Sequence, residues 1–286
     1  MRLDPHPLVE RSIDAYERAH ATYEDNHVEI FNDVEQHRLH ASIDSALQAC
    51  ITGSDPLHAL DLGCGSGNLT RHLVDLGARV TASDVSPRFL TLIADRFRDE
   101  PRVSTLQLNG VDLAEISDAS YDVVGAYSVL HHIPDYLGAV HEAIRVLKPG
   151  GILYLDHEHN EDHWSRSPQL AAFDRAVAEV RRSSAKRWDP KTRRWQRALL
   201  PTTYVRRLQL LRNPDRHRDV EGDIHTHEDD HIEWDAVIRR AELAGARLVA
   251  REDYLLYRPE YPLSVYRAWS TRCTNMAALA LRKSSL

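Results

Sequence analysis

Segment 221–234, with the sequence EGDIHTHEDDHIEW, contains three histidines and six carboxylates within fourteen residues. Imidazole and carboxylate groups can form a metal site without cysteine, and they also act as general acids and bases. In an extended chain Asp223, His225 and His227 share one face, because side chains alternate along a strand. Together with His231, they are candidate ligands for a divalent metal.

A second polar segment, LDHEHNEDHW, covers residues 155–164. In an extended chain His157 and His159 share a face, opposite Asp156 and Glu158. If both polar segments lie at the same edge of a sheet, His157 joins the predicted metal ligands. Three interpretations stay open: a bound divalent metal, acid–base histidines without a metal, and a merely polar loop.

The bulk properties describe an ordinary globular protein. Of its 286 residues, 42% are hydrophobic and 28% are charged. No run approaches the roughly eighteen apolar residues that a membrane span needs, and the charged N-terminus is unlike a signal peptide. Three widely spaced cysteines argue against a disulfide framework. We therefore expect a cytoplasmic protein that is not bound to a membrane.

The net charge of −7 is unevenly distributed. Residues 166–218 contain fifteen Lys and Arg against four Asp and Glu, whereas the first fifty residues contain ten acids against four bases. The basic segment either folds onto the acidic one, which we favour, or meets an anionic substrate or nucleic acid. It includes Trp188 and Trp195 but no recognisable RNA-binding module, so we do not expect nucleic acid as a partner.

Alternating strand and helix patterns predict the elements that position these side chains. Single helices between strands imply βαβ units and a parallel sheet with helices on both faces. The helices are expected at 8–50, 68–76, 87–98, 136–147 and 232–244, the last with Asp229 and Asp230 at its N-terminus. The strands are expected at 57–62, 79–83, 103–108, 121–127, 151–155, 247–257 and 276–281.

The strongest signal is the stretch LDLGCGSGN, residues 60–68, where a strand runs into three glycines and a helix. Without Cβ atoms, Gly63, Gly65 and Gly67 allow a ligand to approach the backbone. The spacing differs from the G-x-G-x-x-G pattern of dinucleotide-binding folds. Asp61 would repel a pyrophosphate, but it suits a ligand with an ammonium and a sulfonium.

This stretch is similar to motif I of the class I S-adenosylmethionine (SAM) dependent methyltransferases, in their small-molecule branch. VTASD at 80–84, NGVDL at 109–113, the segment 121–135 and VLKPGGIL at 146–153 resemble the later motifs. The resemblance implies a Rossmann-like α/β fold, doubly wound, with a seven-stranded, mostly parallel sheet whose last strand is antiparallel. Its parts would be an N-terminal helical lid (1–52), a core (53–159 and 231–286) and a helical cap insertion (160–230).

The resemblance also implies how SAM is held. Asp61 and Gly63 would contact its aminoacyl end with Tyr127 beside it, Asp84 would bind the ribose, and Asp112 would accept from the adenine amino group. An aromatic of segment 15–23 would cover the cofactor. The predicted cofactor-binding residues are Asp61, Gly63, Gly65, Gly67, Asp84, Val85, Asp112, Leu113 and Tyr127.

Methyl transfer needs a nucleophile about 3 Å from the methyl carbon. His132, His131 and His157 are the predicted catalytic residues, although a His-His-Ile-Pro-Asp turn also occurs in this superfamily as scaffold. A metal would favour a hydroxyl acceptor, because it assists deprotonation. We expect methylation of a small molecule, anionic or sugar-like, at a hydroxyl oxygen, with a homodimer compatible with the sequence. The alternatives are a SAM-binding enzyme with non-methylating chemistry and a catalytically silent partner subunit.

Overall fold

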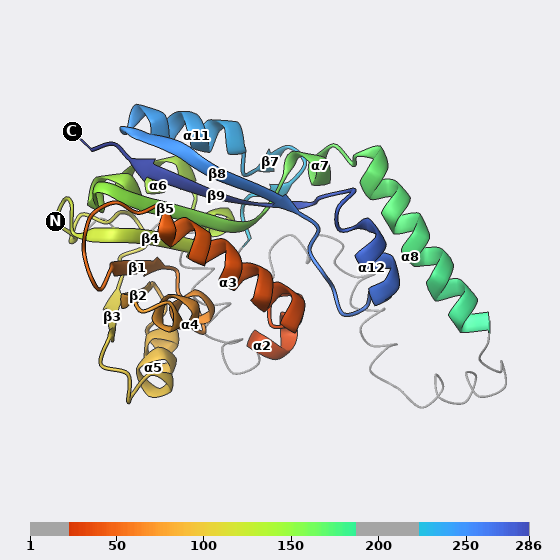
Figure 1. The fold of residues 1–286 in the computed structure, drawn as a ribbon, viewed down its shortest axis with the longest axis horizontal. Helices are drawn as coiled ribbons and strands as arrows, with labels where there is room; N and C mark the ends of the chain where they lie inside the picture. Colours follow the sequence, from red (N-terminus) through yellow and green to blue (C-terminus); the bar gives the residue numbers. More distant parts are fainter. Residues whose placement is uncertain (1–22, 187–222, 286) are drawn as a thin grey trace, which may run out of the picture.

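The computed structural model describes residues 23–186 and 223–285, which form a sheet with helices on both faces (Figure 1). The sheet has the strand order β3-β2-β1-β4-β5-β9-β8. β1 pairs in parallel with β2 and β4, and β9 runs antiparallel to its neighbours β5 and β8. The strands are β1 (His58–Leu62), β2 (Arg79–Asp84), β3 (Val103–Gln107), β4 (Tyr121–Tyr127), β5 (Leu147–His159), β8 (Ala246–Tyr254) and β9 (Met276–Lys283). This arrangement confirms the predicted doubly wound sheet.

The central strands are short apolar runs because helices cover both of their faces. All seven residues of β4 are buried, as are four of the five in β1. The chain leaves β1 for β2 on one side and reaches β4 on the other, so a crevice opens at the carboxyl ends of these strands.

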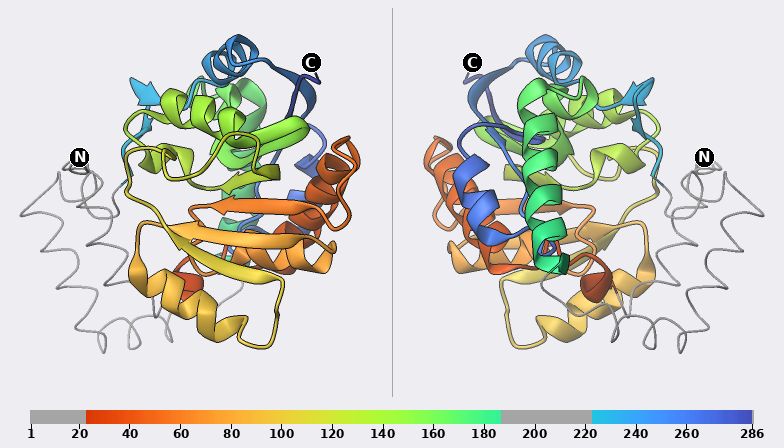
Figure 2. Two further views of the ribbon diagram at one scale, coloured as in Figure 1. Left: turned by 90° about the vertical axis from the view of Figure 1, so that its left-hand side faces the viewer. Right: turned by 90° about the vertical axis from the view of Figure 1, so that its right-hand side faces the viewer.

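Two layers of helices enclose the sheet (Figures 1 and 2). Apolar side chains of α3 and α4 form one core with the sheet, and those of α6 and α11 form a second core on the opposite face. α5 packs against β2 and β3. The helices of these layers are α3 (Asp33–Gln48), α4 (Asn68–Asp75), α5 (Pro87–Arg96), α6 (Tyr136–Val146) and α11 (Trp234–Leu243).

Helix α3 lies within the segment predicted to be a lid, and it is fixed to the core. Arg38 donates a hydrogen bond to Asp156 of β5 at 2.8 Å, and Tyr127 of β4 donates one to Glu35 at 3.0 Å. Leu39 is fully buried against the sheet. This buried network holds α3 against the sheet in the structure, and a closing lid at residues 1–52 stays a prediction. Residues 1–22 of the predicted lid lie outside the described residues.

β5 ends at His159, and α7 (Glu161–Trp164) follows at the start of the segment predicted to be a cap insertion. α8 (Pro168–Lys186) packs against α12 (Leu263–Trp269) through Phe173, Val177 and Val265, which form a separate small core. The chain is next described from residue 223, so Trp188 and Trp195 lie outside the described residues.

A short hairpin changes the expected start of the helix after the insertion. β6 (Thr226–His227) pairs with β7 (Asp230–His231), and α11 begins only at Trp234. The prediction that Asp229 and Asp230 lie at the N-terminus of this helix is therefore wrong. Asp230 and His231 pair with His227 and Thr226 in the hairpin, and the N-cap of α11 is Glu233.

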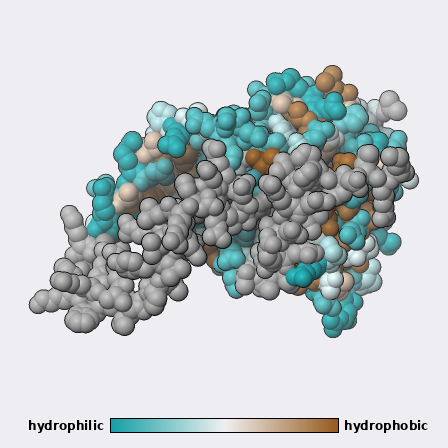
Figure 3. All heavy atoms as spheres, turned by 180° about the vertical axis from the view of Figure 1, so that it is seen from behind, coloured by the Kyte–Doolittle hydropathy of each residue, from teal (hydrophilic) through white to brown (hydrophobic). Residues whose placement is uncertain are grey.

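The visible surface of the described residues is largely hydrophilic. From behind, teal side chains predominate among the coloured atoms and brown hydrophobic atoms occur in scattered patches (Figure 3). Within residues 23–186 and 223–285, none of the helices combines the length and the apolar character needed to cross a bilayer.

Candidate active site

The glycine loop after β1 is shaped for a ligand that lies close to the backbone. Gly63, Gly65 and Gly67 have positive φ angles of 69°, 49° and 91°. A Cβ atom at Gly63 would lie 2.8 Å from Val129, and one at Gly67 would lie 2.6 Å from Ile93. A Cβ atom at Gly65 would meet nothing within 4 Å. Gly63 and Gly67 are thus required by packing, whereas open space over Gly65 can receive a ligand.

Asp84, at the end of β2, holds this loop in place. Its Oδ2 accepts a hydrogen bond from the backbone N–H of Gly65 at 3.0 Å, and its Oδ1 accepts one from Ser86 at 2.8 Å. Burial raises the pKa of the Asp84 carboxyl above its ordinary value. Asp84 and Val85 line the cavity beside the loop, at the position where the resemblance places the ribose.

Asp61, within β1, is only 1% exposed and accepts a hydrogen bond from Thr70 at 2.5 Å. Burial raises the pKa of Asp61 to about 7, and a nearby ammonium group would favour the ionised form. Asp61 lines a small pocket with Ser66 and Asn68. Ser66 Oγ and Asn68 Nδ2 are buried without a hydrogen-bond partner among the described residues. This set fits a ligand end that carries both an ammonium and a carboxylate.

The neighbouring cavity combines apolar walls with Asp112. Asn109 donates a hydrogen bond to Asp112 Oδ1 at 2.9 Å, which lowers the pKa of Asp112 and leaves its carboxylate ready to accept. Such a slot suits a flat, partly polar ring. The apolar residues that line it are Leu62, Val85, Phe89, Leu108, Val111, Leu113, Val129, Ile133, Pro134 and Ala139.

Tyr127, predicted to lie beside the cofactor, lines the small pocket that also contains Asp61. Its hydroxyl points away toward α3, where it donates to Glu35. Burial raises the pKa of Tyr127 well above its ordinary value, so this hydroxyl stays protonated. Only the body of the ring is available to a ligand in that pocket.

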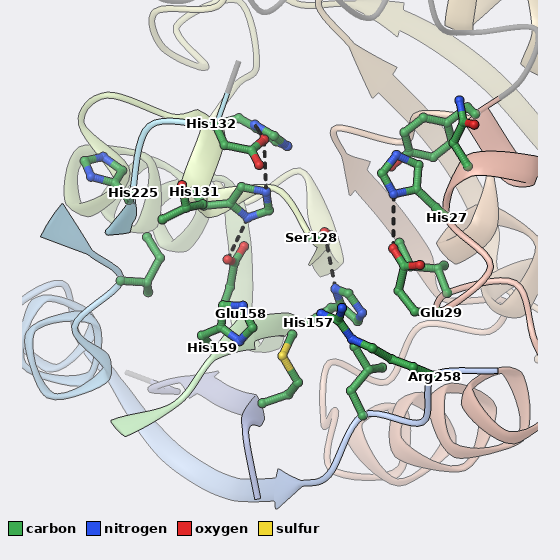
Figure 4. Close-up of a pocket in the computed structure, with 18 of the residues that line it drawn as sticks. His27, Glu29, Ser128, His131, His132, His157, Glu158, His159, His225 and Arg258 are labelled. Atoms are coloured by element: carbon green, nitrogen blue, oxygen red, sulfur yellow. Dashed lines mark hydrogen bonds and ion pairs between the residues drawn. The ribbon is translucent and has the colours of Figure 1, made fainter. Parts of the chain in front are cut away.

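A second cavity, of about 540 Å³, is drawn in Figure 4. It lies beside the slot that contains Asp84 and Asp112, the predicted cofactor slot. Tyr23, Ser128 and His132 line both cavities, so these three residues mark where the two meet. Tyr23 also packs edge-on against Phe89 with ring centroids 5.6 Å apart. Of the aromatics in segment 15–23, Tyr23 is the one that the structure describes.

Two imidazole–carboxylate pairs lie at this junction. Glu158 Oε2 is 2.7 Å from His131 Nδ1, and Glu158 Oε1 accepts from the backbone N–H groups of Val129 and Leu130. Although burial alone would lower the pKa of His131, the carboxylate of Glu158 raises it above its ordinary value. Asp223 Oδ1 is 3.3 Å from His132 Nδ1. Each ring is therefore oriented by a carboxylate.

A β-bulge overturns the predicted alternation along β5. Asp156 pairs with Ala278 and Glu158 with Ala277, so His157 is an extra residue between two consecutive partners. His157 has a φ of 66°, and Asp156 turns away toward Arg38. As a result, Glu158 lines the cavity together with His157 and His159 instead of facing the opposite side.

His157 and Ser128 are held together in sparsely populated backbone conformations, with φ angles of 66° and 59°. His157 Nδ1 is 3.3 Å from Ser128 Oγ, while its Nε2 is buried without a partner among the described residues. Burial lowers the pKa of His157 well below its ordinary value, so the ring is neutral near pH 7. Backbone strain of this kind is concentrated at functional sites.

The predicted metal ligands do not assemble as a group. Only Asp223, His225 and His157 line the large cavity. Both ring nitrogens of His225 lie near oxygens, Asp230 Oδ1 at 2.5 Å and the carbonyl of Ile133 at 3.1 Å, so neither is available to a metal. The remaining two, His227 and His231, are absent from the cavity lining. Among the described residues, the group with the spacing for a metal is His131, His132 and Asp223.

Some lining residues were not predicted from the sequence. Glu158 was placed on the wrong face, and the local pattern contains no signal for the bulge that turns it inward. Ser128 and Arg258 were not considered at all. Ser128 directly follows the fourth predicted strand, which could have indicated it, whereas nothing local distinguishes Arg258 from other arginines.

Comparisons with known proteins agree with this geometry. Residues 60–155 match the family described as methyltransferase domain. The chain is 34% identical over 103 residues to a ubiquinone biosynthesis O-methyltransferase of Alkalilimnicola ehrlichii, covering 36% of this chain and 42% of that protein. The protein of the same name from Xanthomonas campestris is 35% identical over 101 residues, covering 34% and 41%. The chain thus spans about two fifths of the length of these curated relatives.

Solved structures share the fold at low sequence identity. A methyltransferase in complex with the Haloferax volcanii Trm112 methyltransferase activator has a TM-score of 0.55 and 16% identity, over 97% of this chain and 98% of that one. A SAM-dependent methyltransferase from Mesorhizobium loti has a TM-score of 0.52 and 16% identity, over 84% and 96%. The [4+2]-cyclase SpnF has a TM-score of 0.50 and 18% identity, over 86% and 81%. The fold alone therefore does not determine the reaction.

Residues 60–155 therefore contain a methyltransferase domain, in the region where the sequence motifs resemble those of the class I SAM-dependent methyltransferases. The seven-stranded sheet is the fold that this resemblance implied.

Proposed function

We propose that the protein transfers the methyl group of SAM to a hydroxyl oxygen of a small molecule bound in the large cavity. One observation carries this proposal: Tyr23, Ser128 and His132 line the cofactor slot and the large cavity at once. An in-line displacement requires that the methyl donor and the acceptor meet at such a junction, shielded from water. The relatives named as O-methyltransferases support oxygen as the methylated atom.

In the proposed complex Asp84 binds the ribose and Asp112 accepts from the adenine, between walls that include Val85 and Leu113. The pocket of Asp61, Ser66 and Asn68 receives the aminoacyl end. Its unpartnered polar atoms then gain hydrogen bonds, which offsets the cost of burying them. The loop of Gly63, Gly65 and Gly67 lies against the cofactor.

His132 is the proposed general base. The acceptor hydroxyl gives its proton to an imidazole nitrogen as the oxygen–methyl bond forms and the sulfur–methyl bond breaks. The electron pair of the breaking bond stays on sulfur, so S-adenosylhomocysteine leaves as a neutral thioether. Asp223 stabilises the protonated ring, and the neighbouring His131 is held in position by Glu158. The neutral ring of His157 forms a hydrogen bond with the hydroxyl of Ser128, and it helps to orient the acceptor.

A divalent cation is the second candidate for activating the hydroxyl. One ligand atom from each of His131, His132 and Asp223 lies within 4.8 Å of the other two. Glu158 binds Nδ1 of His131, as carboxylates commonly do for metal-bound histidines, which leaves Nε2 on the side of Asp223. A bound ion would lower the pKa of the acceptor hydroxyl. Elemental analysis of purified protein and the effect of chelators on the reaction test this candidate; unchanged rates would leave the imidazoles acting alone.

Incubation with SAM and a panel of phenols, sugars and amines tests the proposed function. Formation of S-adenosylhomocysteine together with a methylated oxygen is the expected result. Binding of SAM without turnover of any acceptor would favour a silent partner subunit. A product formed while SAM stays intact would favour non-methylating chemistry. Methylation confined to amines would contradict oxygen as the acceptor atom.

A further inference from the structure

We infer that the large cavity recognises an acceptor that carries an anionic group, a carboxylate or a phosphate monoester, and that Arg258 binds this group. The inference rests on the proposed methyl transfer and adds the class of its substrate. It comes from the distribution of charges and unpartnered polar atoms around the cavity.

The carboxylates of this cavity already have partners. Glu29 lies 3.2 Å from His27 Nδ1, which helps to lower the pKa of Glu29 although burial opposes it. Glu158 pairs with His131, and Asp223 lies beside His132. None of these acids needs a cation from the acceptor for compensation.

Arg258 is in the opposite situation. It is the sole lysine or arginine among the described residues that line the cavity, and it forms no ion pair with any other described residue. Its Nε is buried and lacks a hydrogen-bond partner within the same part of the chain. Arg258 as a whole is half-buried, and its charge helps to lower the pKa of Glu29 without forming an ion pair with it. A guanidinium with one buried, unpartnered N–H favours an anionic ligand that can accept from it.

Among the described residues, the two histidines near Arg258 add no positive charge. Burial lowers the pKa of His159 to about 4, with the charges of His131 and Arg258 adding to the effect, so this ring is neutral near pH 7. His157 is neutral as well, because burial lowers its pKa. Both rings can offer hydrogen bonds without adding charge, which leaves Arg258 to select the anion.

Further unpartnered donors lie on the same cavity. Of the seven buried side-chain polar atoms that lack partners among the described residues, three belong to the lining: Arg258 Nε, Trp164 Nε1 and His157 Nε2. Indole and guanidinium nitrogens can only donate, and His157 Nε2 donates in the tautomer whose Nδ1 accepts from Ser128. Three donors without acceptors match a ligand that is rich in oxygen.

The positions of these groups suggest how the acceptor lies. Arg258 comes from the segment after β8 and points into the cavity toward His157, on the side away from the His131–His132 pair (Figure 4). An acceptor with its hydroxyl at His132 would extend its anionic end toward Arg258. The cofactor is not the ligand of Arg258, because this residue lines neither the cofactor slot nor the pocket of Asp61.

Calorimetric titration of protein saturated with S-adenosylhomocysteine tests the inference. One matched series is catechol, 3,4-dihydroxybenzoate and 3,4-dihydroxybenzylamine. The other is glucose, glucuronate and glucose 6-phosphate, which separates a carboxylate from a phosphate. We expect an anionic member to bind about tenfold to a hundredfold more tightly than its neutral counterpart. Equal affinity of the anionic and neutral members in both series would overturn the inference.

Variants then assign the effect to one side chain. Arg258→Gln should remove the preference for the anion, and Arg258→Lys should retain part of it. Arg247→Gln, at an exposed position on β8 away from the cavity, should leave it unchanged. Unaltered affinity for S-adenosylhomocysteine shows that the variants are folded. A preference that survives in Arg258→Gln, or a loss of cofactor affinity instead, would contradict the role given to Arg258.

Turnover separates this inference from the proposed function. Preferential binding of an anion without formation of S-adenosylhomocysteine from SAM would leave the recognition intact and argue against methyl transfer to these acceptors. Turnover without any anion preference would support methyl transfer and exclude the anionic substrate class.

Discussion

Apart from Tyr23, the cofactor slot takes its lining from one run of the chain, residues 62–142, whereas the acceptor cavity draws on segments near residues 27, 131, 158, 225 and 258. The slot is built from backbone: a glycine loop, strand ends and hydrogen bonds from amides to Asp84. The cavity is built from side chains that orient one another, such as Glu158 and His131. One region is thus defined by local sequence and the other by tertiary contacts, and variants should affect them separately.

The largest separation is expected for His132→Ala. Loss of the general base should lower kcat by about 10²- to 10⁴-fold, while SAM affinity changes little because the slot keeps its loop and acids. Rates of S-adenosylhomocysteine formation and calorimetric titration with SAM measure the two effects. His141→Ala, at an exposed position on α6, is the matched control. An equal loss of affinity and rate would mean that the two regions are not independent.

Glu158→Gln examines the acceptor side alone. Because a charge-assisted hydrogen bond to His131 is weakened, kcat should fall about tenfold to a hundredfold with unchanged SAM affinity. Glu161→Gln is the matched control. It removes a nearby exposed carboxylate that pairs with Arg251, and kcat should not change. If Glu158→Gln behaves like this control, the orienting role of Glu158 is wrong.

Asp61→Asn examines the cofactor side. In the free protein the pKa of Asp61 is about 7, and an ammonium group binds better to the ionised form. Affinity for S-adenosylhomocysteine should therefore rise from pH 6 to pH 8 in the unaltered protein. The variant should bind about tenfold less tightly at pH 8, with a flatter pH profile. If the affinity of both proteins changed equally with pH, a group other than Asp61 would be responsible for the pH dependence.

The smallest expected effect is on stability. It distinguishes two reasons for glycine in the loop: the packing against a neighbouring side chain and the positive φ angle. Gly67 and Gly77 have φ angles of 91° and 90°, yet only at Gly67 would a Cβ meet a neighbour, Ile93 at 2.6 Å. Gly67→Ala should lower the free energy of unfolding by about 1–3 kcal/mol more than Gly77→Ala. Chemical denaturation without cofactor measures the difference. Equal losses of unfolding free energy in the two variants would mean that the positive φ angle alone accounts for the destabilisation.

The sequence predicted the sheet and the glycine loop after β1 well, since both depend on short-range patterns. Apolar runs between helices indicated parallel strands, and the glycines between β1 and α4 indicated the loop. The acceptor side was predicted less well. Alternation along β5 assigned Glu158 to the wrong face, because the bulged residue His157 interrupts the alternation between Asp156 and Glu158.

The predicted metal set illustrates the same limit. Asp223 reaches the His131–His132 pair, but His225 is taken up by Asp230 and Ile133, and His227 lies in a hairpin outside the cavity. Residue types and spacing showed that histidines and acids were present, not which of them already had partners. The cytoplasmic location and the homodimer stay predictions.

By itself the sequence determined the order of the seven sheet strands along the chain, the Cβ-free loop and the acids at the strand ends, because each depends on residues adjacent in the chain. Only the tertiary structure decided which polar groups share the acceptor cavity. That outcome depends on the bulge in β5, on the fixed position of α3 through Arg38 and Asp156, and on the approach of Arg258 from beyond β8. Contacts between segments far apart in sequence have no local signature, so partners and faces emerge only when the chain is folded.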